Sequence, residues 1–160
     1  MARGAIYGYL QRLLALDDTP ERIATAFSIG VFLAFSPLLG LHTILGLAIA
    51  FIFRLNRAAV LIGVFVSNPW TIVPIYTAGA YLGWHLFGSS TPPVLPDLRL
   101  ANLWHFGYWR DVLFDEHILK TLVLGSTILS FVAAGVSYPL ALWVIRGERA
   151  YRARHKHGIL

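Results

Sequence analysis

The sequence predicts an all-α integral membrane protein with two re-entrant-like helix-break-helix segments, a C-terminal transmembrane helix and an N-terminal amphipathic helix. Of its 160 residues, 57% are hydrophobic and 13% are charged, whereas roughly 25% are charged in ordinary soluble domains. Three long stretches contain no Asp, Glu, Lys or Arg: residues 23–53, 58–96 and 121–145. Each is longer than the roughly 20 residues that cross a bilayer core. Proline and small polar residues interrupt the first two stretches.

Residues 1–17 are expected to form the amphipathic helix, lying on the membrane surface. Apolar residues recur there at helical spacing, with Arg3 and Arg12 among them, so the segment is too polar to span a bilayer. No small-residue cleavage site follows an apolar core, as it would in a secretory signal. We therefore expect the mature protein to keep this segment.

Residues 20–53 are expected to form the first broken segment. The uncharged run 23–53 would be about 46 Å long as one straight helix, which exceeds a bilayer core of roughly 30 Å. Ser36, Pro37 and Gly40 supply a break near its middle, since proline removes a backbone donor and glycine tolerates a chain reversal. We expect a hairpin that dips into the bilayer and returns.

Residues 58–88 show the same organisation after a short polar link. An apolar run is interrupted at Ser67, Asn68 and Pro69, and a second run then contains Gly79 and Gly83. Small residues four positions apart predict close packing against another helix.

A short repeat accompanies the two breaks. The tetrapeptide Ile-Gly-Val-Phe occupies residues 29–32 and again 62–65, and a polar residue followed by proline comes after each copy at nearly the same offset. An order of helix, break and helix in two copies is the organisation of repeat-built transporters. A match of four residues in apolar helices also arises by chance, so both explanations stand.

The remainder predicts an external loop with an aromatic interfacial helix (89–117), a transmembrane helix (118–146) and a basic cytoplasmic tail (147–160). The tail carries the densest positive charge, and the positive-inside rule places it in the cytoplasm. The first helix and the link at Arg54 and Arg57 are also basic and should prefer that side. If all three are cytoplasmic, the first broken segment returns to its starting side, the second crosses once and the last helix comes back. This multi-pass topology suits a cytoplasmic membrane, although equivalent repeats should not differ in whether they cross.

Three motifs carry a resemblance to a known family. They are IGVFLAFSPLLGLHT at residues 29–43, Arg54-Leu55-Asn56, and Ser67-Asn68-Pro69 followed by Thr71, Pro74 and Tyr76. Together they resemble the bacterial membrane proteins of domain-of-unknown-function family 2062, from about residue 23 to the final helix. The resemblance implies a membrane protein with lipid or envelope work, because family members are sometimes joined to glycosyltransferase domains that act at membranes. It implies no particular substrate.

The helix breaks are the candidate functional site, because broken backbone at membrane depth survives only where it is buried in protein or lines a wet cavity. The helix after the first break should be capped by Thr43 and flanked by His42, and its positive N-terminal end suits a phosphate or carboxylate. The predicted substrate-binding residues are Ser36, Pro37, Gly40, His42, Thr43, Arg54, Asn56, Ser67, Asn68, Pro69, Thr71 and Tyr76. The alternative is that they only satisfy broken backbone and hold two hairpins together.

Two features of this set have further alternatives. His42 is the only ionisable side chain in its uncharged run, which suits either proton coupling or a neutral hydrogen bond between helices. Arg54 and Arg57 flank Asn56 at a predicted membrane edge, where they suit a lipid headgroup or simply anchor the helix ends.

No catalytic or metal site is predicted, and we expect no enzymatic activity and no cofactor. The acidic residues all lie outside the apolar stretches, and the serines lack a His-carboxylate partner arrangement. His155 and His157 lack a third metal ligand. The net charge of +5 gathers at the edges of apolar stretches instead of on a soluble basic face, so we expect no nucleic-acid partner.

The sequence therefore favours a transporter or flippase-like protein that moves or positions a lipid-linked or other anionic substrate through a polar site at the breaks. Its expected partners are membrane lipids, anionic or polyprenyl, and further copies of the chain. The alternative is a non-catalytic scaffold that recruits or orients an envelope or glycolipid enzyme.

Overall fold

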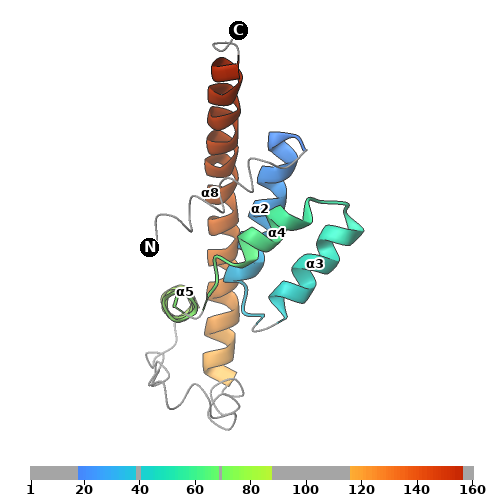
Figure 1. Ribbon diagram of the computed structural model, residues 1–160. Coiled ribbons are helices and arrows are strands. Elements are labelled where there is room, and N and C mark those ends of the chain that lie inside the picture. The colour runs from blue at the N-terminus through green and yellow to red at the C-terminus, as the bar shows by residue number, and fades with distance from the viewer. Residues whose placement is uncertain (1–17, 39–40, 69, 88–115, 157–160) are drawn as a thin grey trace.

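A computed structural model describes residues 18–38, 41–68, 70–87 and 116–156, and all regular structure in this part of the chain is helical. Its helices are α2 (Pro20–Phe35), α3 (His42–Ile52), α4 (Arg57–Val64), α5 (Ile72–Phe87) and α8 (Glu116–Lys156), as Figure 1 shows. The all-α prediction is confirmed. The predicted surface helix of residues 1–17, and the predicted external loop up to residue 115, lie outside the described residues.

Helix α8 is the longest element, and both α2 and α5 pack against it (Figure 1). Its 41 residues correspond to a length of about 61 Å at 1.5 Å per residue. The stretch Leu119–Tyr151 is long and apolar enough to cross a membrane, and only 11% of its most apolar window is buried. Residues 147–156, which we expected as a tail, continue the helix, because Ala, Arg and Glu are good helix formers.

Helices α2 and α3 form a hairpin. The Thr19 hydroxyl caps α2 by accepting the Arg22 N–H, and Pro20 takes the first helical position, where its missing N–H costs nothing. At this same end of the hairpin, Arg22 Nη2 donates to the backbone oxygen of Arg54 over 3.1 Å. Arg54 lies just past the end of α3, so the chain returns to the level at which α2 begins.

Helices α2 and α4 cross where a glycine of one meets a glycine of the other. A Cβ atom on Gly30 would strike the Val60 carbonyl oxygen and lie 2.9 Å from the Gly63 Cα. A Cβ on Gly63 would strike the Phe27 carbonyl oxygen and lie 2.9 Å from the Gly30 Cα. Phe27 and Val60 each precede their glycine by three residues, so the contact is reciprocal. Both glycines belong to the repeated Ile-Gly-Val-Phe.

Helices α5 and α8 also meet through small residues. A Cβ on Gly83 would strike the Thr121 carbonyl oxygen, and one on Gly125 would strike the Gly79 carbonyl oxygen. The close packing predicted from Gly79 and Gly83 is therefore present, with the N-terminal half of α8 as the partner.

The core that holds these helices together is small. Its fully buried apolar side chains come from α2, α3, α4 and α8: Ile23, Ala26, Leu33, Ala50, Ala59, Val60, Val64 and Ile145. Helix α3 contributes only Ala50 to this core, and Gly46 and Ala50 are the buried residues of the helix. Most of its apolar surface faces outward.

Candidate site at the paired helix breaks

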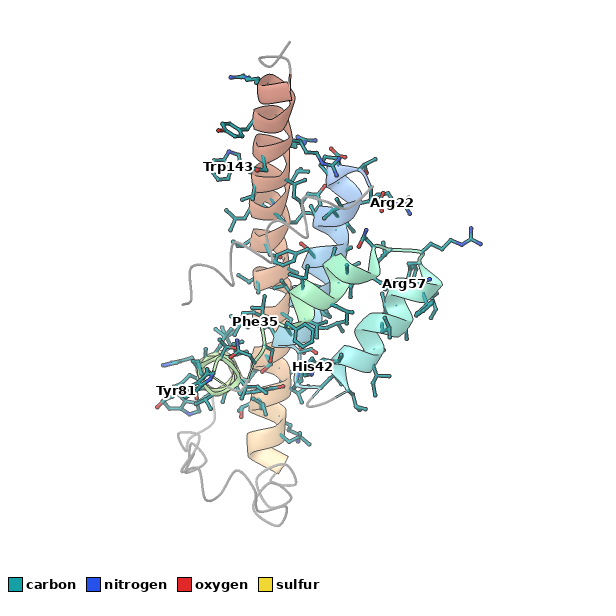
Figure 2. The ribbon with its side chains drawn as sticks, in the orientation of Figure 1. Arg22, Phe35, His42, Arg57, Tyr81 and Trp143 are labelled. Carbon is teal, nitrogen blue, oxygen red and sulfur yellow. The ribbon has the colours of Figure 1, made fainter. Side chains whose placement is uncertain are left out.

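The structure divides the predicted site residues into two groups. Eight of them lie at or beside the breaks: Ser36, Pro37, His42, Thr43, Ser67, Asn68, Thr71 and Tyr76. Arg54 and Asn56 lie past the far end of α3, whose 11 residues measure about 16 Å. Figure 2 shows this separation, with Arg22 and Arg57 at one end of the hairpin and His42 at the other. Gly40 and Pro69 lie outside the described residues.

Ser36 closes the end of α2 at the first break. Its backbone N–H donates to the carbonyl oxygens of Phe32 and Leu33, and its hydroxyl donates to Leu33 O over 2.7 Å. The residue is buried, with 6% of its surface exposed. These bonds pair carbonyl groups that the end of a helix leaves without intrahelical partners.

Tyr76 links the second broken segment to the first break. It comes from the second turn of α5, and its hydroxyl donates to the backbone oxygen of Ser36 over 3.2 Å. The two breaks are therefore neighbours in space, although Ser36 and Tyr76 are 40 positions apart in sequence.

Asn68 and Thr71 hold the chain reversal that leads into α5. The Asn68 side-chain oxygen accepts the N–H groups of Trp70 at 3.0 Å and Thr71 at 3.1 Å. In return, the Thr71 hydroxyl accepts the Asn68 N–H at 2.8 Å and donates to Val66 O at 2.7 Å. This reciprocal pattern satisfies backbone groups, as capping boxes do. For these two residues, the hydrogen bonds agree with the backbone-satisfying alternative.

Ser67 differs from its neighbours at the second break. Ser67 is 8% exposed. Its hydroxyl has no hydrogen-bond partner among the described residues. Burying an unpaired hydroxyl costs about 1–3 kcal/mol. Such a group is a candidate for satisfaction by a ligand or an ordered water.

His42 and Thr43 open α3. His42 is its first residue, half-buried, with Nδ1 at 3.1 Å from Leu38 O; because a carbonyl only accepts, Nδ1 carries the proton in this contact. The prediction that Thr43 caps α3 is wrong. The N-cap is Leu41, which makes no side-chain capping bond, because the helical backbone already begins before Thr43.

Arg54 and Asn56 surround the turn between α3 and α4. The Asn56 side-chain oxygen caps α4 by accepting the Ala59 N–H at 3.2 Å. Arg54 has a φ of 51°. Among the described residues, it is the one non-glycine residue with a positive φ. Such a conformation costs about 1–2 kcal/mol for a residue with a Cβ. Neither residue has a hydrogen bond to the described parts of the breaks.

Contacts that no sequence pattern predicted attach the start of α2 to α8. Arg146 Nη2 lies 2.6 Å from the Glu21 carboxylate, and this hydrogen bond lowers the pKa of Glu21. Arg149 donates to Asp18 O over 2.6 Å. The only indication of these contacts in the sequence was that the two segments, which lie far apart along the chain, carry opposite charges.

Polar groups also join α2 to α8 deeper in the molecule, and the sequence analysis did not single them out. The Ser28 hydroxyl lies 3.1 Å from both Ala134 O and the Ser137 hydroxyl. Serine within an apolar run was the available signal, since such residues often bond across helices. No group of three or more metal-ligating side chains occurs within the described ranges.

Comparison with known proteins identifies one family to which this chain is related. The model of a family described as "Uncharacterized protein conserved in bacteria (DUF2062)" matches residues 5–154. This match confirms the resemblance found in the motifs. Neither the curated proteins nor the solved structures contain a match to this chain.

Proposed function

We propose that this chain, which belongs to the bacterial DUF2062 family, is a small multi-pass protein of the inner membrane. Its paired helix breaks bind the polar part of a lipid-linked or other anionic substrate, which the protein moves or positions across the bilayer. The observation that carries this proposal is the buried hydroxyl of Ser67, which has no partner among the described residues and lies at a break beside the other break.

Exposed apolar surface supports the placement in a membrane. On α8, Phe131 is 65% exposed, Leu140 57% and Trp143 75%. On α3, Ile44 is 68% exposed and Ile52 is 73% exposed. Contiguous apolar surface of this kind is unfavourable in water and normal against lipid.

The hairpin geometry supports a re-entrant segment. The 16 residues of α2 rise about 24 Å, so a break at its end lies within a bilayer core of roughly 30 Å if its start is at the surface. Charged residues at the start of α2 favour the surface for that end, and α3 returns toward the same level through the Arg22 contact with Arg54. Both breaks then sit at membrane depth.

The reciprocal crossing of α2 and α4 supports an internal duplication. Chance repetition of Ile-Gly-Val-Phe gives no reason for the two copies to touch through equivalent atoms. Gly30 and Gly63 make equivalent contacts with each other's helix. Inverted repeats with broken helices are a frequent basis for substrate sites near the membrane midplane.

The experiment is native mass spectrometry of the full-length protein, extracted gently from its own membrane, with retained lipids recorded. We expect wild type to retain a selective anionic or polyprenyl lipid, and Ser67→Ala to retain about tenfold less, as the loss of one hydrogen bond to a charged group predicts. Its thermal stability should not fall, because the hydroxyl that the substitution removes makes no hydrogen bond among the described residues.

Ser126→Ala is the matched control. Ser126 is also buried, and its hydroxyl has no partner in the described part of the chain. It faces Gly79 where α5 crosses α8 and lies outside the breaks. It should retain lipid like the wild type. Unchanged lipid retention in Ser67→Ala, or equal loss in both variants, would contradict the substrate site.

A scaffold is the second candidate, and the length of α8 favours it. At about 61 Å, this helix is roughly twice as long as a bilayer core is thick, so residues 147–156 extend as a basic helix that a partner enzyme can contact. Removing residues 147–160 should release a partner from a scaffold, whereas lipid retention at the breaks should persist in a transporter.

A further inference from the structure

Three arginines gather at the open end of the α2–α3 hairpin, which we call the hairpin mouth: Arg22, Arg54 and Arg57. The Arg22 guanidinium bonds the backbone of Arg54 at 3.1 Å, and Arg57 follows three positions later as the first residue of α4. All three are exposed. Figure 2 shows Arg22 and Arg57 on the side of the hairpin away from α8.

Charge at the hairpin mouth is incompletely balanced. Among the described residues, the carboxylate near this group is Asp18, at 3.7 Å from Arg22. None lies within salt-bridge distance of Arg54 or Arg57 in the same part of the chain. Arg146, by contrast, pairs with Glu21 at 2.6 Å. The mouth therefore carries positive charge that an anion can neutralise.

Arg57 lies against an aromatic ring. Its guanidinium carbon lies 3.8 Å from the centre of the Phe51 ring. Stacking uses the face of the guanidinium and leaves the N–H groups on its edge, which match the oxygens of a phosphate in bidentate geometry. A lysine in this place would lack both properties.

Apolar side chains border these arginines directly. Phe51 is 53% exposed, Ile52 73% and Phe53 67%. A free phosphate has no apolar part that could contact these side chains. A phospholipid, by contrast, can place its phosphate beside the arginines and its acyl chains along the apolar residues. Charge and apolar surface together select a lipid.

We infer that the hairpin mouth is a binding site for an anionic phospholipid headgroup, with Arg54 and Arg57 as its phosphate ligands. It is separate from the proposed substrate site, because α3 lies between the two. Ser67→Ala therefore leaves this binding intact, and failure of either proposal does not affect the other.

The test measures binding of dioleoylphosphatidylglycerol and dioleoylphosphatidylcholine to the full-length protein in detergent by native mass spectrometry. Wild type should prefer the anionic lipid. Arg54→Gln/Arg57→Gln should bind it about 30-fold more weakly, from the usual contribution of two surface arginines, with unchanged helical content by circular dichroism.

Arg154→Gln is the matched control, because it removes an exposed arginine from the far end of α8 and should change binding less than about twofold. Equal binding by the double variant and wild type would overturn the inference. Displacement of the lipid by millimolar inorganic phosphate would also overturn it, because the site would then recognise phosphate without the lipid.

Discussion

Replacing Gly30 by alanine should lower the free energy of unfolding by about 3 kcal/mol, the upper range for overpacking a tight interface. The added Cβ would meet the backbone of α4 at the Val60 carbonyl oxygen, the Gly63 Cα and the Val64 nitrogen. Backbone atoms cannot rotate away as a side chain does, so the helices must separate along the crossing. Thermal denaturation in detergent, followed by circular dichroism, measures the change.

Gly135→Ala is the control for this prediction. Gly135 lies within α8, and a Cβ there has nothing within 4 Å, so the substitution should stabilise by about 1 kcal/mol through helix propensity. If Gly30→Ala melted at the wild-type temperature, α2 and α4 would not cross through their glycines, and the support for an internal duplication would be lost.

Gly83→Ala should detach α5 from α8. The new Cβ would strike the Thr121 carbonyl oxygen and lie 3.0 Å from its Cα, so α5 must move away from a contact made of backbone. We expect amide hydrogen exchange in residues 72–87 to accelerate at least about tenfold, which corresponds to about 1.4 kcal/mol of local stability. Exchange within α2 should change much less.

The corresponding control is Gly147→Ala, because Gly147 also has open space around its missing Cβ. It should leave exchange in α5 at the wild-type rate. Uniform acceleration through α2 and α5 in Gly83→Ala would mean that the two interfaces form one cooperative unit, contrary to the local effect expected here.

Local chemistry made several features predictable from sequence. Proline after a polar residue stops a helix through sterics within a few residues, and α2 indeed ends at Phe35, directly before Ser36 and Pro37. The spacing of Gly79 and Gly83 likewise predicted a close helix contact. It did not identify Thr121 and Gly125 as the partners, because those lie far along the chain.

The grouping of the candidate site was less predictable. The sequence grouped Arg54 and Asn56 with the breaks. In the folded hairpin these two residues lie at the mouth, and the first break forms the turn at the opposite end. Thr43 was assigned a capping role that needs extended backbone, but Leu41 already has helical angles, φ −84° and ψ −19°. The link from Tyr76 to Ser36 depends on tertiary packing, which no local pattern encodes.

Polar residues at the breaks illustrate why composition alone does not separate structure from function. Ser67, Asn68 and Thr71 are equally polar and nearly adjacent. Asn68 and Thr71 bond backbone groups of their own turn, while the Ser67 hydroxyl finds no partner within the described ranges. Only the folded geometry distinguishes them, and it makes Ser67 the most informative position to substitute.

The most direct test of the re-entrant hairpin is single-cysteine labelling, for which the cysteine-free chain is well suited. Cysteines at Thr19, Leu38 and Arg54 would be exposed to a membrane-impermeant maleimide in vesicles of each orientation. Thr19→Cys and Arg54→Cys should react from the same face, and Leu38→Cys from neither. Reaction of Leu38→Cys from the face opposite Arg54→Cys, or of Thr19→Cys and Arg54→Cys from opposite faces, would contradict a hairpin that enters and leaves on one side.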